Sequence, residues 1–301
     1  MRKLYYALVL ILTLYSCNMG DRANTNTLTV TIEPQRYFLE QIVGDMFEVN
    51  TLVPPGSSPE TYEPSPMAMI NLGNSKAYFK VGFLGYENAW SGKLAKNNPN
   101  VVVVDCSDGV DLMYGTHGPH GHDDDHAHHD HGPDAPDPHI WSSPKNALKM
   151  SQNMLDAMLK LDPDNAEYYK TNFETLAENI ANTDLLIRDK IKDIKSRSFI
   201  IYHPALSYFA RDFDLEQHSI EFEGKNPSPA QMKELVDLAK SEAITVVLIQ
   251  QEFDVKNTQV IASELGTKPH VINPLAYDWK EEMLSLAKIL SEENEESNSR
   301  D

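Results

Sequence analysis

Positive charge is scarce in this sequence. Lysine and arginine contribute 26 residues against 45 aspartates and glutamates, which gives a formal net charge of -19 at pH 7. Proteins that bind nucleic acid cluster lysine and arginine on one face, because the phosphate backbone rewards positive charge. No run of basic residues occurs here, so we expect no nucleic-acid partner. The acidic balance suits a soluble surface and the attraction of cations.

Long hydrophobic runs are also missing. The apolar run at residues 4–15 follows two basic residues and is shorter than the roughly 20 residues that a membrane span needs. A short apolar run behind a positive start is typical of a signal peptide. Because the run ends in LTLYSC, which resembles a lipobox, we predict a lipoprotein signal peptide at residues 1–16, lipidation of Cys17 and a polar tether at 17–27. A plain secretory signal or an uncleaved anchor is the alternative.

Cysteine is nearly absent, with two residues in the whole chain. The second, Cys106, follows the apolar run at residues 101–104. No internal disulfide can form once Cys17 is acylated. We therefore expect Cys106 to be a small buried side chain of a hydrophobic core.

Histidine, in contrast, is concentrated in one segment. Most of the 11 histidines fall in residues 114–132, where they alternate with aspartates and almost no apolar side chain occurs. Such a segment cannot build a core, so we expect a solvated loop. Neutral imidazole suits zinc, copper and nickel, which predicts a low-affinity metal-binding loop, with an incidental polar insertion as the alternative. The histidines of this loop are His117, His120, His122, His126, His128, His129 and His131.

The rest of the chain alternates apolar, β-rich runs with helical patterns. Predicted strands lie at residues 28–32, 47–53, 77–81 and 101–104, and again at 199–202, 217–220, 245–249 and 270–272. Strands that alternate with helices indicate parallel sheets with helices on both faces. Between the two sets, residues 164–195 contain no glycine or proline and carry apolar side chains at helical spacing, which predicts one long helix.

The expected fold class is therefore α/β, with two Rossmann-like lobes, each a four-stranded parallel sheet with flanking helices, joined by one long linker helix. The predicted boundaries are 28–163 for an N-terminal metal-binding lobe, 164–196 for the linker helix, 197–293 for a C-terminal metal-binding lobe and 294–301 for a disordered tail.

Side chains that can bind metals follow several predicted strands. In open α/β sheets, ligands bind beyond the carboxyl ends of the strands. Glu60 lies in the loop after the second strand, and His139 follows the fourth strand and the histidine-rich loop. In the second half, His203 directly follows the first strand, and Asn273 and Asp278 follow the last. The convergence of positions from both lobes favours a metal held in the cleft between them.

Three of these segments resemble the motifs of one protein family. PPGSSPETYEPSP at residues 54–66 is similar to a Gly-x-x-Pro-His-x-Tyr-Glu-Pro loop, and DPHIWSSP at 137–144 matches an Asp-Pro-His-x-Trp signature. IIYHPALSYFARDFDL at 200–215 matches a segment of strand, histidine and aromatic helix. Over about residues 28–290 the chain resembles the periplasmic zinc- and manganese-binding proteins of ABC transporters, the ZnuA/TroA-like family (cluster A-I). The long linking helix and a His/Asp-rich loop, mostly in zinc-binding members, are also features of this family.

The resemblance implies a set of metal ligands. His139 and His203 match the histidine ligands of the family. The first ligand of the family is usually a histidine, where this chain has Glu60, and the fourth is often an aspartate, where this chain has Asn273. The predicted ligands are Glu60, His139, His203 and Asp278. Asn273 or a water is the alternative to Asp278, which could instead cap the helix that follows it.

The metal follows from the donor set. Two imidazoles with one or two carboxylates suit zinc in tetrahedral geometry, and manganese or ferrous iron with more oxygens. Glu60 favours the harder metals, whereas the histidine-rich loop favours zinc. We therefore predict Zn²⁺ as the bound ion, with Mn²⁺ or Fe²⁺ as the alternative.

The resemblance implies transport rather than catalysis. We expect an extracytoplasmic, monomeric lipoprotein that is anchored to the membrane through Cys17 and delivers its metal to an ABC permease with its ATPase. A zinc hydrolase could use similar ligands, but the chain has no HExxH motif and no evident general base beside the site, so we expect no enzyme. Some relatives are described as adhesins, but the sequence offers no separate feature for adhesion.

Overall fold

The computed structural model of the chain describes residues 26–87, 96–114, 135–221, 225–254 and 256–298. The predicted signal peptide, Cys17 and all histidines of the histidine-rich loop lie outside these residues. Among the helices within them, none combines the length and the apolar character that crossing a membrane requires.

The N-terminal lobe is built on a four-stranded parallel sheet. Its strands are β1 (Thr27–Val30), β2 (Glu48–Thr51), β3 (Ala77–Lys80) and β4 (Val102–Asp105), in the order β2-β1-β3-β4. Its helices are α2 (Glu33–Val43), α3 (Pro66–Gly73) and α5 (Pro144–Leu161), with short 3-10 helices at Gly44–Met46, Ile140–Ser142 and Pro163–Asn165. α3 and α5 both begin with a serine whose side chain accepts a backbone N–H, followed by a proline at the first helical position. This arrangement is typical of a helix start.

The C-terminal lobe repeats this topology. Its strands are β5 (Ser198–Ile201), β6 (Glu216–Ser219), β7 (Val247–Gln250) and β8 (Pro269–Ile272), in the order β6-β5-β7-β8. Its helices are α7 (Ser207–Asp212), α8 (Pro229–Ser241), α9 (Lys256–Glu264) and α10 (Trp279–Asn298). All strand pairs within both sheets are parallel. The predicted fold class of two parallel-sheet α/β lobes is confirmed.

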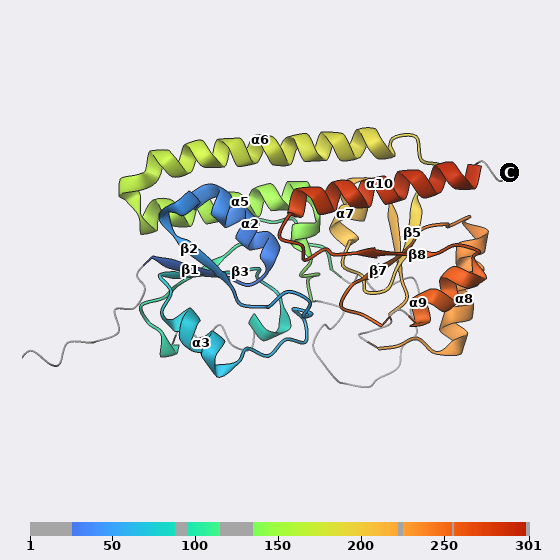
Figure 1. The fold of residues 1–301 in the computed structure, drawn as a ribbon, viewed down its shortest axis with the longest axis horizontal. Helices are drawn as coiled ribbons and strands as arrows, with labels where there is room; N and C mark the ends of the chain where they lie inside the picture. The colour runs from blue at the N-terminus through green and yellow to red at the C-terminus, as the bar shows by residue number, and fades with distance from the viewer. Residues whose placement is uncertain (1–25, 88–95, 115–134, 222–224, 255, 299–301) are drawn as a thin grey trace, which may run out of the picture.

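The long helix between the lobes is α6 (Ala166–Ile191), which has 26 residues and would be about 39 Å long at 1.5 Å per residue. It packs against α2 and α5 of the N-terminal lobe and against α10 of the C-terminal lobe. Figure 1 shows α6 and α10 side by side along one edge of the molecule, above both sheets. The predicted linker helix is therefore present and is packed along its length rather than free.

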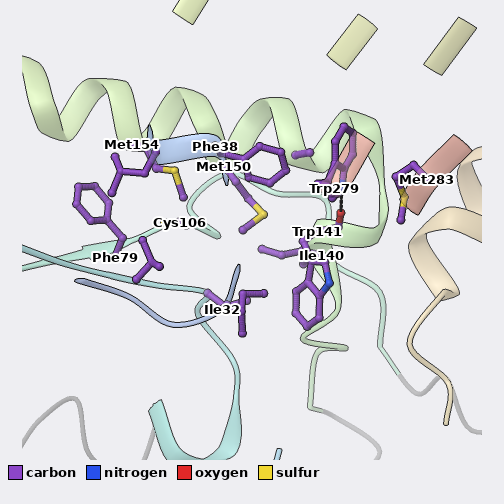
Figure 2. Close-up of a cluster of buried hydrophobic side chains, with 14 of the residues drawn as sticks. Ile32, Phe38, Phe79, Cys106, Ile140, Trp141, Met150, Met154, Trp279 and Met283 are labelled. Atoms are coloured by element: carbon purple, nitrogen blue, oxygen red, sulfur yellow. Dashed lines mark hydrogen bonds between the residues drawn. The ribbon is translucent and has the colours of Figure 1, made fainter. Parts of the chain in front are cut away.

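A continuous hydrophobic core joins the two lobes. Figure 2 shows its central part, where Trp279 at the start of α10 packs with Phe38 of α2 and Met150 of α5. The indole nitrogen of Trp279 donates to the backbone oxygen of Trp141 at 2.8 Å. Cys106 is buried in the same core and unpaired, as predicted, and burial raises the pKa of its thiol.

The C-terminal end differs from the prediction. The disordered tail was expected from residue 294, but α10 continues to Asn298. This segment is rich in glutamate, which is a good helix former. Its polar composition is therefore compatible with a helix as well as with a disordered tail.

Candidate metal centre

Glu60, His139 and His203 meet where the two lobes face each other. The Nε2 atom of His203 lies 3.2 Å from the Nε2 atom of His139 and 3.1 Å from the Oε1 atom of Glu60. The same Glu60 oxygen lies 3.3 Å from the Nε2 atom of His139. Zinc bonds to nitrogen and oxygen of about 2.0–2.1 Å imply ligand atoms about 3.3 Å apart in a tetrahedron. The three atoms are therefore spaced like one face of such a site.

The local sequence around His139 fixes its orientation. Asp137 lies two residues earlier, and its Oδ1 atom accepts a hydrogen bond from the backbone N–H of His139 at 2.8 Å. The same oxygen lies 2.7 Å from the Nδ1 atom of the His139 ring. With Nδ1 bonded to a carboxylate, Nε2 is left to face the site. Asp137 therefore holds the turn and the ring.

His203 is fixed by residues of the neighbouring strands. It follows β5, and its backbone N–H donates to the side-chain oxygen of Gln250 at 3.3 Å, while the Gln250 amide donates to the His203 carbonyl at 2.6 Å. The Nδ1 atom of the His203 ring lies 3.2 Å from Oε2 of Glu221. The ring of Phe253 stacks on His203, with the two centroids 5.4 Å apart. Both imidazoles thus have a carboxylate behind them and Nε2 in front.

The charges of the site are strongly coupled. Burial disfavours the cationic form of both histidines, but the surrounding carboxylates outweigh it and raise the pKa of His139 to about 9 and that of His203 to about 10. Burial also disfavours the Glu60 carboxylate, yet the attraction of His203 and the hydrogen bond to His139 hold its pKa well below the usual range. The histidines therefore carry protons where a cation would bind.

The structure places the other two candidates differently. Asp278 is exposed, and its Oδ1 atom accepts a hydrogen bond from the backbone N–H of Glu281 at 3.4 Å, so it caps α10. The backbone N–H of Asn273 donates to Glu282, and the Asn273 side-chain oxygen is buried without a hydrogen-bond partner in the described chain. The described histidines, cysteines and acids that gather at this site are Glu60, His139 and His203.

A small cavity of about 10 Å³ borders the three clustered residues. This is about the space that one water-sized particle occupies. Trp141, Phe253, Pro274 and Leu275 contribute to its apolar wall, and Glu252 is the further acid among the described residues that line it. Burial raises the pKa of Glu252, while the charges of His203 and His139 act in the opposite direction.

The sequence reasoning missed Glu221 and Glu252. Glu221 follows β6 and Glu252 follows β7, so both lie just beyond strand ends at the same edge of the sheet as His203. The rule that located Glu60 and the histidines, a search for metal-binding side chains after each strand, would have found them if applied to every strand.

A second group of acids and histidine lies at the edge of the C-terminal sheet. The Nε2 atom of His218 in β6 lies 3.2 Å from Oε2 of Glu242 and 4.0 Å from Oε1 of Glu216. The contact with Glu242, the residue after α8, joins the strand to the end of that helix. We interpret it as a hydrogen-bonded contact that holds these two elements together.

Two α/β lobes that present imidazole and carboxylate side chains to each other are the architecture of a metal-binding protein. The sequence model of the family "Zinc-uptake complex component A periplasmic", ZnuA, matches residues 28–291. The chain belongs to this family, whose members are the binding component of a transport complex and not enzymes. The predicted family resemblance is therefore confirmed.

Known proteins similar to this chain share both its sequence and its fold. It is 32% identical over 267 residues to the high-affinity zinc uptake system protein ZnuA of Bacillus subtilis, covering 87% of this chain and 82% of that protein. It is 26% identical over 276 residues to the zinc-binding lipoprotein AdcA of Streptococcus pneumoniae, covering 88% of this chain and 53%, or about half, of that protein. A crystal structure of ZnuA superimposes with a TM-score of 0.81 at 32% identity, covering 90% of this chain and all (100%) of that chain.

Proposed function

We propose that this protein captures Zn²⁺ outside the cytoplasm and delivers it to an ABC permease that is driven by its ATPase. The observation that carries the proposal is the group formed by Glu60, His139 and His203, whose three facing atoms lie within 3.3 Å of one another. Folded elements hold these atoms in place before any metal arrives, which is how a site gains affinity. The zinc-binding relatives support the same ion.

Mn²⁺ is the second candidate, because Glu60 contributes an oxygen where the family usually has an imidazole. Oxygen ligands suit manganese better than nitrogen ligands do. Elemental analysis of the natively purified protein, followed by competition titration between the two ions, decides between them. We expect zinc at about one ion per chain, and a manganese-filled, zinc-poor protein would contradict the choice of zinc.

The site itself is tested by removing its imidazoles. His139→Ala and His203→Ala should each abolish tight metal binding in isothermal titration, because the remaining ligands cannot surround the ion. His270→Ala is the matched control, since His270 pairs with Glu293 at 2.8 Å in the C-terminal lobe and belongs to no described ligand group. Tight binding that survives both site variants would contradict the proposed site.

Membrane anchoring completes the proposal. The lipoprotein name of one relative supports lipidation of Cys17, with residues 17–27 as the tether that leaves the folded lobes free to reach the permease. Cys17→Ser should release the protein from the membrane fraction, and unchanged fractionation would contradict lipidation. We also propose that the protein is a monomer, which light scattering during gel filtration tests.

The histidine-rich loop is proposed to collect zinc at low affinity beside the main site. Its composition cannot preorganise ligands as folded strands do. Deleting residues 116–132 should remove several weak zinc equivalents and leave one tight equivalent in a titration. If the deletion also abolished the tight zinc equivalent, the histidine-rich loop itself would contain the high-affinity site, contrary to the proposal.

A further inference from the structure

The clustered ligands leave one position of a tetrahedral ion to be filled. Glu60, His139 and His203 provide three atoms, whereas zinc takes four ligands. Asp278 is engaged as the cap of α10. Asn273 is not among the residues that line the cavity beside the histidines, although its neighbours Pro274 and Leu275 are. The described acid that lines this cavity together with Glu60 is Glu252.

We propose that Glu252 supplies the fourth ligand and completes a set of two imidazoles and two carboxylates. This inference rests on the proposed function, because it assumes that the cavity between the lobes is the metal site. It places the last ligand on the turn after β7, rather than after β8 where the sequence predicted it.

The residues before and after Glu252 both contact His203, one of the proposed ligands. Two residues earlier, Gln250 exchanges two hydrogen bonds with the backbone of His203. One residue later, Phe253 stacks on the imidazole of His203. Because β7 pairs with β5, these contacts hold the turn beside the end of the strand that presents His203. The backbone of Glu252 is therefore fixed at the rim of the cavity, whereas its carboxylate lies outside the group of ligand atoms within 4.8 Å of one another, so the side chain has to turn inward to reach the ion.

The charges also favour a ligand role for Glu252. Its side chain is partly buried in the cavity wall, where a carboxylate loses hydration. Both His139 and His203 attract it electrostatically. A divalent ion between these residues would stabilise the carboxylate more strongly than the imidazoles do, since its charge is larger and closer. Two carboxylates would then neutralise the two charges of the ion.

Glu252→Gln tests the proposal, with zinc and cobalt as the probes. The amide keeps the size of the side chain but removes its charge, so we expect zinc to bind at least about tenfold more weakly in a competition titration. The visible absorption of the Co²⁺-loaded protein should also change, because a ligand of the ion changes. Asp254→Asn is the matched control, as Asp254 lies on the same turn, is exposed and pairs with Lys256.

The outcomes separate this inference from the proposed function. Weaker zinc binding and an altered cobalt spectrum in Glu252→Gln alone, with a metal-free melting temperature equal to that of the unaltered protein, would support Glu252. Unchanged affinity and spectrum would overturn the inference. The inference would also be overturned if Asn273→Ala weakened zinc binding and altered the cobalt spectrum while Glu252→Gln had no effect. If the unaltered protein bound no metal tightly, the proposed function itself would fail.

Discussion

The two histidines of the site hold protons that a metal must displace. The surrounding carboxylates raise the pKa of His139 to about 9 and that of His203 to about 10, so the pair of rings holds excess protons at pH 7.5 in the metal-free protein. A metal ligand must be a neutral imidazole. Because the two rings lie 3.2 Å apart and titrate as a coupled pair, we expect zinc binding to release between one and two protons.

Titration calorimetry at pH 7.5 in buffers of different ionisation enthalpy measures this release. The apparent affinity should rise with pH up to about 9–10, by up to about tenfold per unit for each proton released, and level off above that range. Binding heats that are the same in every buffer would show that the imidazoles are already neutral, contrary to the raised pKa values.

Single residues also show how much of the candidate site could be predicted from the sequence. His139 and His203 could be placed because each is adjacent to proline in a distinctive segment. Asp278 could not, since a helix cap and a metal ligand both require an aspartate in a loop, and only the position of the Glu281 amide distinguishes them. Glu252 also follows a predicted strand, so the strand-end rule makes it a candidate, but its nearness to His203 depends on the pairing of β7 with β5, which the sequence does not reveal.

At the scale of elements, the contact between α2 and α6 depends on a glycine. Gly44 follows α2 with φ +55°, and a Cβ placed on it would overlap the hydroxyl oxygen of Tyr168 in α6. Gly266 follows α9 with a similar φ of +68°, but no atom lies within 4 Å of its Cβ position. Gly266→Ala should lose about 1–2 kcal/mol, because an alanine at positive φ is strained. Gly44 combines φ +55° with ψ −140°, a conformation that is almost restricted to glycine, so the backbone cost of Gly44→Ala should be at the upper end of about 1–3 kcal/mol. Gly44→Ala should lose about 1 kcal/mol more, because Tyr168 must move.

Urea unfolding of the two metal-free variants beside the unaltered protein gives these losses. A larger loss for Gly44→Ala than for Gly266→Ala is expected. Equal losses would mean that neither the backbone conformation of Gly44 nor the contact with Tyr168 adds a cost, contrary to the close approach of α6 to the end of α2.

Helices and strands could be predicted where their signal lies in a short stretch of sequence, such as an apolar run or a helix start. All eight predicted strands overlap observed ones, because most are short apolar or β-branched runs between helical patterns. The exception is the largely polar β6 (EQHS), whose position follows from the helical patterns on either side. The order β2-β1-β3-β4 and its repeat in the second lobe were not predicted, since order depends on how the crossover helices pack. The extent of α10 was also missed, because glutamate is common both in tails and in helices.

The whole molecule is built to keep its lobes together. Trp141 and Trp279 are almost fully buried, and the Trp141 indole donates to the carbonyl of Pro274 at 2.9 Å. Across the same boundary, the hydroxyl of Tyr208 donates to the carbonyl of Asp137 at 2.8 Å. A hinge opening would expose these aromatic side chains at about 2–3 kcal/mol each. Metal loading should therefore act through the ligand loops and leave the lobes in place.

Solution scattering and amide hydrogen exchange together test this local closure. The zinc-loaded and chelator-treated proteins should give the same radius of gyration, because α6 and the shared core fix the distance between the lobes. Zinc should slow exchange in the loops that carry Glu60, His139, His203 and Glu252, while α6 and the strands exchange at unchanged rates. A clear contraction on loading would indicate hinge closure between the lobes. Loops that exchange at the same rate in both states would instead show that no loop closes over the metal.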